Sequence, residues 1–435
     1  MKKIEYTSAL LREKYTYIQH ASGLPIYVFP KKMTNTYALF ATKYGSVYNV
    51  LPTADGGTEE VPEGIAHYLE HKLFESEKGD AFRDFAQTGA SANAYTTFDR
   101  TAYLFHASEN IMPSLEILLN FVQDPYFTPE TVQKEQGIIG QEIRMGEDMP
   151  NRRVLFNMLK GLFHKHPVRV DIAGTVESIA KITPELLYRC YYRYYNLHNM
   201  VLVVAGRITP DEVMDACDRL LKPAEEWVPD NYVIDEPATA AQEYVEDKMA
   251  VAAPLFYIGF KEPVVNHTPK TLAGARMLID LISGKSSPLY TRLLEEGLIN
   301  DQFEVEYFGG PDYGIWLFGG ESADPKRVKE LIAELKKEKE EKKKKKLPLR
   351  RNIENNIFAL AQVWGTSKLY FIIHYFVTFI YAPIDFLLYT YLIRLIVDSV
   401  EGHGWSTDAI FTYIFAVGGG AICIWVVSNY YWNTI

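Results

Sequence analysis

The chain has 435 residues, too many for one ordinary hydrophobic core, so at least two domains are expected. Its formal net charge of −10 argues against a nucleic-acid-binding protein, because such a protein needs a basic face to neutralise phosphates. The three cysteines, Cys190, Cys217 and Cys423, are spaced unlike a disulfide framework or a cysteine zinc site. Residues 283–287, SGKSS, look like the end of a phosphate-binding loop, but Ile279 stands where that motif needs its first glycine, so no nucleotide site is predicted.

Residues 34–46, TNTYALFATKYGS, alternate in the manner of a half-buried strand, and a helix is predicted to follow them. That helix contains the stretch GIAHYLEHKLFE, residues 64–75. Residues four apart share one helical face, so His67 and His71 lie one turn apart and Glu70 projects from nearly the same side. Such a cluster indicates a zinc site. The alternative is a helix whose polar face carries these residues by accident.

A second helix is predicted further along, at residues 128–148, after a short polar helix (78–89) and a pair of strands (91–107). Its glutamates Glu135 and Glu142 are seven residues apart, which is two turns along one helical face. A catalytic zinc site needs a third protein ligand beside two histidines, and it keeps one position open for water. This helix offers a carboxylate for that role, although surface solvation also accounts for such a pair.

The order strand, helix, helix, strand pair then recurs about 210 residues further on. In this second copy, Ala275, Leu278 and Ile279 stand where the first copy has histidine, glutamate and histidine. A helix in the same structural place therefore does without the ionisable trio, which disfavours a purely structural reason for the trio. The elements of the second copy lie within residues 251–263, 271–285, 286–297 and 302–320.

The motif H-x-x-E-H, followed by a helix with two glutamates spaced by seven, resembles the M16 family of zinc metallopeptidases (pitrilysin, insulinase and mitochondrial processing peptidase). The likeness covers roughly residues 1–335 and is greatest to the small bacterial processing-protease branch. It extends to NAYTTFDRTAY from Asn93, HPVRVDIAGTVESI followed by HNMVLVVAG, and GKSSPLYTRLLEEGLIND. The resemblance implies an α+β fold of duplicated M16-type α/β sandwich domains, with a zinc-peptidase domain at 1–225 and a truncated second domain at 226–335.

The resemblance also implies a role for each residue of the motif. His67, His71 and Glu142 would hold one zinc ion per chain. Glu70 would be the general base, and Glu135 would steady a ligand histidine. An edge strand would hold the substrate peptide extended as an added strand. The implied substrate-binding residues are Ser91, Ala92, Asn93, Ala94, Tyr95 and Thr96.

The predicted function is that of a zinc-dependent endopeptidase that cleaves small peptides or leader sequences at the cytoplasmic side of a membrane. The second copy, however, reaches one helix, PKRVKELIAELKKEKE, and then a run of lysines, whereas the first continues to the strand MVLVVAG. The family's arginine and tyrosine, which reach the substrate from the second domain, find no match. The alternatives are a non-catalytic, zinc-holding peptide-binding subunit or an exporter-associated fragment. Besides a peptide substrate, the resemblance implies a second M16-type chain as partner, in a homo- or heterodimer.

Composition changes near residue 336, where lysines and glutamates indicate a linker over residues 336–356. Residues 357–435 are predicted to form a two-helix transmembrane hairpin. Its apolar runs, 369–397 and 409–428, are each long enough to cross about 30 Å of hydrocarbon. Lysines and arginines precede the first run and are absent from the connecting loop, so the positive-inside rule places the peptidase domain in the cytoplasm.

The predicted localisation is therefore a bacterial inner membrane. The first twenty residues contain no apolar run, so no signal peptide is expected. Residues 350–435 resemble the first two membrane helices of a bacterial ABC exporter. His374 and Asp385 would share one side of the first apolar run, where an ionisable group is either functional or packed against protein.

Overall fold

The computed structural model describes residues 2–53, 55–77, 79–226, 234–262, 267–310 and 312–344, and in 335–344 it describes the backbone only. The chain divides into two structural units, Met1–Leu335 and Lys336–Ile435. Nearly all described residues belong to the first unit, which contains both copies of the repeat. The domain boundaries at 225 and 335 stay predictions.

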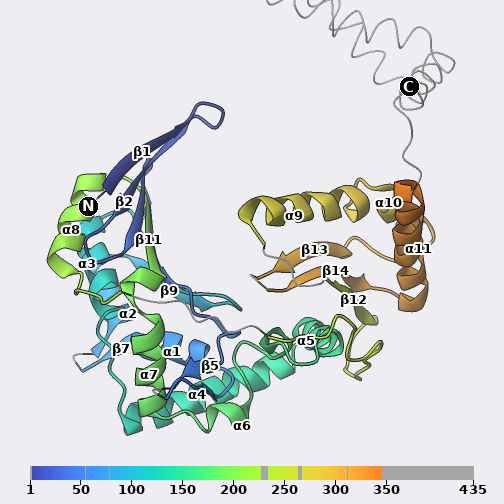
Figure 1. Cartoon of the computed structure of the whole chain (residues 1–435), viewed down its shortest axis with the longest axis horizontal. Coiled ribbons are helices and arrows are strands. Elements are labelled where there is room, and N and C mark those ends of the chain that lie inside the picture. Colours follow the sequence, from blue (N-terminus) through green and yellow to red (C-terminus); the bar gives the residue numbers. More distant parts are fainter. Residues whose placement is uncertain are drawn as a thin grey trace, which may run out of the picture. The chain divides into compact units, whose positions relative to one another are not determined.

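A seven-stranded sheet organises the first copy of the repeat (Figure 1). Its order is β1-β2-β3-β11-β4-β10-β9, and all neighbours are antiparallel except β11 and β3. In β11, Met200, Leu202 and Val204 are buried in alternation with half-buried residues, as expected of a central strand. The strands of this sheet are β1 Lys2–Ser8, β2 Glu13–Gln19, β3 Pro25–Pro30, β4 Thr36–Thr42, β9 Ser91–Thr96, β10 Thr101–Ala107 and β11 Met200–Gly206. Two small antiparallel pairs lie outside it: β5 Val50–Pro52 pairs with β6 Thr58–Glu60, and β7 Glu75–Ser76 pairs with β8 Gly79–Asp80.

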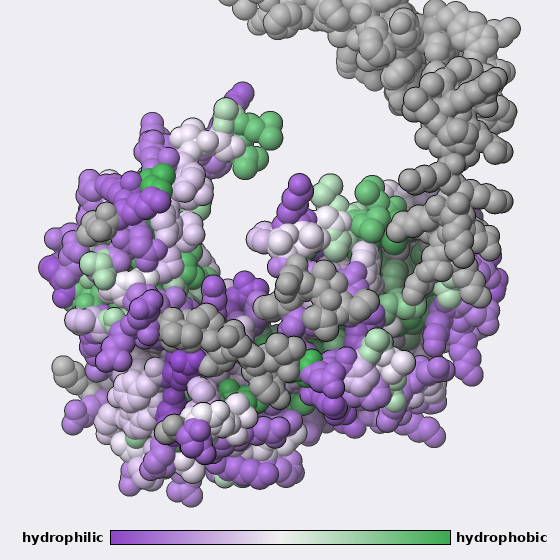
Figure 2. All heavy atoms as spheres, in the orientation of Figure 1, coloured by the Kyte–Doolittle hydropathy of each residue, from purple (hydrophilic) through white to green (hydrophobic). Residues whose placement is uncertain are grey.

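All but one of the helices in this part of the chain share one hydrophobic core with this sheet, and the exception, Pro150–Leu162, buries Leu159 and Leu162 in a separate core with Ile315 and Leu317 of the second copy. Threonine followed by proline begins three of them: Thr128, Thr183 and Thr209 each accept a backbone N–H, and the proline at the next position needs no hydrogen-bond partner. The helices are α1 Ile65–Leu73, α2 Ala81–Thr88, α3 Ile111–Phe121, α4 Pro129–Glu147, α5 Pro150–Leu162, α6 Val176–Ile179, α7 Pro184–Tyr194 and α8 Pro210–Leu220. The tip of the β1–β2 hairpin instead exposes Leu10 and Leu11 to solvent (Figure 2).

Helix α1 begins where the backbone around Gly64 lies very close to the backbone around Gly174. Gly64 has φ +88°, and a Cβ there would lie 2.3 Å from the carbonyl oxygen of Ala173. Gly174 has φ +74°, and a Cβ there would lie 2.4 Å from the carbonyl oxygen of Glu63. Only glycine combines this backbone conformation with so close an approach. The contact therefore fixes where α1 starts, and with it the place of His67 one turn later.

Gly64→Ala is expected to destabilise the protein by at least about 2 kcal/mol, because it adds left-handed backbone strain to a steric clash. Gly137→Ala is the matched control, since Gly137 lies in α4 and a Cβ added there would enter open space. That change should be neutral or slightly stabilising. Urea unfolding of both variants measures the difference, and equal stability would contradict this explanation of the α1 start.

The second copy of the repeat builds a three-stranded sheet in the order β12-β14-β13. The same relative order, β4-β10-β9, occurs in the first copy. The core between this sheet and its helices includes Ile279, Leu293 and Tyr307. The elements are β12 Leu255–Lys261, α9 Pro269–Ser283, α10 Pro288–Glu295, β13 Glu304–Gly309, β14 Gly314–Glu321 and α11 Pro325–Lys344.

The second copy is less enclosed than the first. Strand β4 pairs with β10 on one side and β11 on the other, whereas β12 pairs only with β14 among the described residues. Leu69 and Leu73 of α1 are 0% and 1% exposed, but Met277 and Leu281, at the matching places of α9, are 66% and 73% exposed. Within the described residues, α9 therefore lacks the cover that α4 and α7 give to α1.

A buried ion pair ties the connecting segment to both copies. The carboxylate of Glu236 accepts the backbone N–H groups of His164, Lys165 and His166 at 2.8–2.9 Å and the Nζ of Lys261 at 2.9 Å. Burial alone would raise the pKa of Glu236, but these four donors outweigh it and hold the pKa at about 2, from an ordinary 4.5. Because the pKa is lower in the folded state, this stabilisation is complete above pH 4.5 and is lost as the pH falls towards 2.

Glu236→Gln is therefore expected to lower stability by about 2–3 kcal/mol at pH 7 and to make stability less sensitive to acid between pH 5 and 3. Glu243→Gln, on an exposed residue of the same segment, is the control and should follow the wild type. The measurement is urea unfolding at pH 7, 5 and 3. If the unfolding free energies of wild type and Glu236→Gln changed with pH in parallel, the four donors would not favour the ionised form of Glu236 over the protonated form.

The predicted transmembrane hairpin and inner-membrane localisation are not supported, and both are corrected here. Among the described residues, no helix is both long and apolar enough to cross a membrane. The two longest, α4 and α11, have 19 and 20 residues but carry many lysines and glutamates, whose charges oppose burial in hydrocarbon. The apolar runs 369–397 and 409–428 lie outside the described residues, and the prediction rested on sequence features alone. What the structure supports is an α/β fold with two domains.

Candidate metal centre

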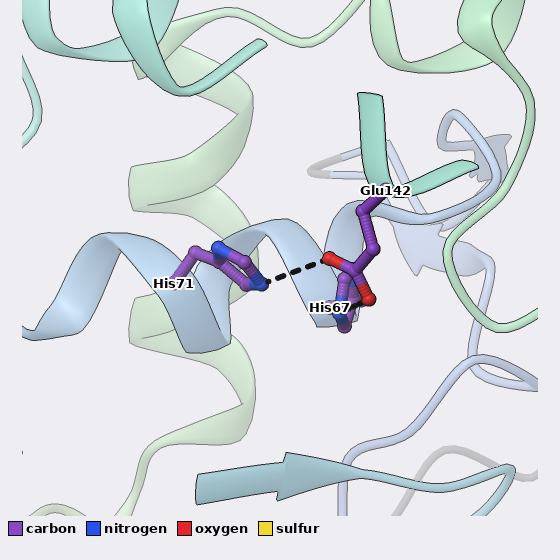
Figure 3. A group of neighbouring side chains, drawn as sticks. All are labelled: His67, His71 and Glu142. Atoms are coloured by element: carbon purple, nitrogen blue, oxygen red, sulfur yellow. Dashed lines mark ion pairs between the residues drawn. The ribbon is translucent and has the colours of Figure 1, made fainter. Parts of the chain in front are cut away.

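Three predicted ligands converge from two helices (Figure 3). His67 and His71 project from the same side of α1, with ring centroids 4.6 Å apart. Glu142 of α4 lies between them: its Oε1 is 3.6 Å from Nε2 of His67, and its Oε2 is 3.5 Å from Nε2 of His71. The structure thus brings together two imidazole nitrogens from one helical turn and a carboxylate from a separate helix much further along the chain.

The packing of α4 on α1 explains how Glu142 reaches this place. Val132, Ile139 and Ile143 of α4 are buried at helical spacing, so this face of α4 turns towards the core. The hydroxyl of Tyr68, on α1, donates a hydrogen bond to the backbone carbonyl of Val132. These contacts fix the two helices side by side, and Glu142 then extends from α4 over the histidine-bearing face of α1.

Glu135 lies about two turns before Glu142 on α4 and contacts the other ring nitrogen of the second histidine. Its Oε1 accepts a hydrogen bond from Nδ1 of His71 at 2.9 Å. With Nδ1 held by Glu135, the Nε2 of His71 is directed at Glu142. This is the arrangement expected of a carboxylate that orients a metal-ligating histidine.

The charges of the group suit a cation between the three side chains. Burial, with a smaller effect of His71, lowers the pKa of His67 to about 4, so this imidazole is neutral at pH 7. Burial alone would lower the pKa of His71 too, but Glu135 and Glu142 outweigh it and raise the pKa to about 9. Without a metal, a proton on His71 therefore supplies the positive charge that the two carboxylates attract.

The donor set fits zinc. Neutral imidazole nitrogens and a carboxylate oxygen are common zinc ligands at about 2.0–2.2 Å, so neighbouring ligand atoms around tetrahedral zinc are about 3.4 Å apart. The separations of 3.5 and 3.6 Å are near this value, although each joins a histidine to a different oxygen of Glu142. One ligand atom from each residue lies within 4.8 Å of the others. A zinc ion could thus take the place of the proton on His71.

Glu70 lies on the same helix, between the two histidines in sequence, and is buried. Burial raises its pKa, and the hydroxyl of Thr96 opposes this by donating a hydrogen bond to Glu70 Oε2 at 2.6 Å. The pKa of Glu70 also responds to the charges of His71 and Glu142, so the carboxylate belongs electrostatically to the same centre.

The predicted peptide-binding strand is β9, at the edge of the seven-stranded sheet. It pairs with β10 and, among the described residues, with no other strand. Helix α1 packs against it, so the predicted strand and the metal group are neighbours. Side chains alternate along β9: Ser91, Asn93 and Tyr95 are exposed, whereas Ala92, Ala94 and Thr96 are half-buried and turn inwards.

Two features of this region were not predicted from the sequence. One is the hydrogen bond from Thr96 to Glu70, which joins residues 26 apart. The other is a bidentate ion pair between Arg152 of α5 and Asp171, at 2.5 and 2.7 Å, whose charges both act on His67. No spacing within the sequence reveals either pair, because each joins two separate elements.

The comparisons with known proteins decide the family. A family model described as Insulinase (Peptidase family M16) matches residues 55–176, and one described as Peptidase M16 inactive domain matches residues 181–350. The uncharacterized zinc protease YmfH of Bacillus subtilis (strain 168) is 41% identical over 346 residues, covering 77% of this chain and 80% of YmfH. The chain belongs to the peptidase M16 family. The predicted M16 resemblance is therefore confirmed.

Two further comparisons point to the same family. An M16-like peptidase from Alicyclobacillus acidocaldarius, known from its crystal structure, is 38% identical in sequence to this chain. The two structures match with a TM-score of 0.70 over 74% of this chain and 77% of that one. A Schizosaccharomyces pombe protein described as a mitochondrial-processing peptidase subunit beta is 27% identical over 184 residues, 40% of each chain. None of these comparisons supports the predicted exporter resemblance of residues 350–435.

Proposed function

We propose that this M16 chain is a zinc-dependent endopeptidase that hydrolyses short peptides or leader sequences. The observation that carries the proposal is the convergence of His67, His71 and Glu142 on one point beside the buried carboxylate of Glu70. The relatives named zinc proteases support the choice of zinc as the metal. The edge strand β9, against which α1 packs, supports a peptide as substrate.

Each residue then has a separate part in the reaction. Zinc, held by His67, His71 and Glu142, would supply a Lewis acid that polarises the peptide carbonyl and acidifies a neighbouring water. Glu70 accepts a proton from that water as the water oxygen bonds to the carbonyl carbon. Glu70 then returns the proton to the amine nitrogen as the C–N bond breaks. The raised pKa of Glu70 suits both accepting and returning the proton, because it lies closer to neutral pH than the pKa of an ordinary glutamate.

Strand β9 positions the peptide for this attack. Its outer backbone N–H and C=O groups would pair with a further strand, once the Ala94 N–H is released from the side chain of Asn93, and this pairing would fix the main chain of the peptide beside α1. Ser91, Asn93 and Tyr95 expose their side chains and would meet the side chains of the peptide. The experiment that tests the proposal is digestion of a peptide library by the zinc-loaded protein, with products identified by mass spectrometry. Cleavage that stops when a chelator is added supports it, and an unchanged library contradicts it.

A second candidate function is that of a zinc-holding chain that binds peptides without cutting them. The smaller second domain favours it: its sheet has three strands among the described residues, against seven in the first domain. Peptide binding without turnover in the same digest would establish this alternative. The partnership with a second M16-type chain stays a prediction; one M16 relative is by its name one subunit of a peptidase.

Glu135→Gln is expected to lower zinc affinity about 10- to 100-fold, because the amide holds the Nδ1 of His71 less strongly than the carboxylate does. Glu147→Gln, on an exposed residue near the end of the same helix, is the matched control and should leave zinc affinity unchanged. Competition with a coloured chelator measures both affinities. Equal affinity in wild type and Glu135→Gln would show that Glu135 does not orient a zinc ligand.

A further inference from the structure

We propose that Thr96 is a positioning residue for Glu70, holding one oxygen of its carboxylate so that the other is presented to the attacking water. The inference rests on the proposed function and adds to it a residue that acts through the general base. Thr96 was expected only to offer its backbone to a substrate. Its side chain instead points inwards, and its hydroxyl donates to Glu70 Oε2 at 2.6 Å.

The length of this hydrogen bond suits an ionised carboxylate as its acceptor. A separation of about 2.5–2.7 Å is typical of a hydroxyl that donates to an ionised carboxylate. The bond therefore stabilises Glu70 in the form that can accept a proton. It engages Oε2, and no hydrogen bond from a described residue engages Oε1, which leaves Oε1 for the water.

The hydroxyl of Thr96 packs against the core. Its Oγ1 lies 3.2 Å from Oγ1 of Thr101, whose own proton goes to the backbone carbonyl of Tyr44 at 2.8 Å, so with the Thr96 proton on Glu70 the two hydroxyls are in packing contact only. Thr101 and Tyr44 are fully buried, and the ring of Tyr44 stacks on Tyr194 at 4.1 Å. The oxygen of the Thr96 hydroxyl is thus packed against a buried part of the molecule, which holds it within reach of Glu70.

Thr96 also connects the base to the predicted peptide site. It is the last residue of β9 and pairs with Thr101 of β10. Its backbone belongs to the edge strand, while its side chain holds Glu70. Because one residue does both, a peptide that adds to β9 is placed in a fixed relation to the base. Loss of the hydroxyl should therefore affect the chemical step more than peptide binding.

The first test compares Thr96→Val, which removes the hydroxyl at nearly constant volume, with Thr96→Ser, which retains it. Thr97→Val is the matched control, because the hydroxyl of Thr97 donates to Asp99 instead. We expect Thr96→Val to lower kcat about 10- to 100-fold with KM nearly unchanged, and Thr96→Ser and Thr97→Val to stay close to wild type. Equal losses in Thr96→Val and Thr96→Ser, or a raised KM with kcat unchanged, would overturn the proposal.

The second test needs no activity and so separates this inference from the proposed function. In zinc-free protein, a double-mutant cycle joins Thr96→Val with Glu70→Ala and reads the unfolding equilibrium constant in urea. The two changes should be coupled by roughly tenfold, as a hydrogen bond to a charged group predicts, and Thr97→Val should show no coupling with Glu70→Ala. If wild type cleaves no peptide, the proposed function fails, yet this cycle still decides the contact: coupling below about twofold contradicts it.

Discussion

Glu70→Gln is expected to lower kcat for peptide cleavage about 10²- to 10⁴-fold while leaving one zinc ion bound per chain. Glutamine has nearly the shape of glutamate, and its amide oxygen can still accept the hydrogen bond from Thr96. It cannot accept a proton from water, so the attacking nucleophile is no longer generated. The three groups that would hold zinc, His67, His71 and Glu142, are untouched by the change.

The measurement for Glu70→Gln combines initial cleavage rates with zinc content by metal analysis. Both are needed, because loss of activity together with loss of zinc would indicate a damaged site and not a missing base. Glu75→Gln is an unsuitable control, since Glu75 pairs with the fully buried Lys72 beside the site. Glu147→Gln is suitable and should retain both zinc and activity. A Glu70→Gln protein that cleaves as fast as wild type would exclude Glu70 as the base.

His71→Ala is expected to abolish both zinc binding and peptide cleavage. His71 is the histidine that contacts both carboxylates, with Nδ1 on Glu135 and Nε2 facing Glu142. Its removal takes away one zinc ligand, and it leaves Glu135 and Glu142 without the positive charge of zinc or of protonated His71 between them. The loss of zinc affinity should exceed the roughly 10- to 100-fold effect of residues that only orient a ligand.

Thermal unfolding measured with and without zinc tests the His71→Ala prediction apart from activity. Zinc at about 100 times its dissociation constant stabilises a folded protein by about 2.7 kcal/mol, so wild type should melt at a higher temperature when zinc is added. His71→Ala should show no such rise. His106→Ala, on an exposed histidine of β10, is the matched control and should keep the full rise. A His71→Ala protein that zinc still stabilises fully would place the metal elsewhere.

The metal centre could be predicted in part because three of its residues are close together in the sequence. His67, Glu70 and His71 fall on one helix, where the period of about 3.6 residues alone brings them together. Glu142 was predicted from its spacing to Glu135 and from the M16 likeness, and the structure places it against both histidines. The spacing could not show which of the two glutamates faces which histidine nitrogen, because that depends on how α4 packs on α1.

Other parts depend on tertiary contacts that no sequence period encodes. Strand β11 lies between β3 and β4, far from its neighbours in sequence, so the sheet order could not be predicted. The link between Thr96 and Glu70 joins a strand to a helix and has the same origin. The membrane hairpin was a different kind of failure. It was predicted from the hydropathy of residues 369–397 and 409–428, and nothing in the described residues supports it.

The most direct test of the zinc peptidase is a titration of activity with metal. Zinc is first removed from the wild-type protein with a chelator, the chelator is removed, and zinc is returned in steps while cleavage of one peptide is followed. The proposed site, formed by His67, His71 and Glu142, predicts no cleavage without metal and a rise that saturates at one zinc per chain. Cleavage that persists without metal, or none at any zinc concentration, would contradict it.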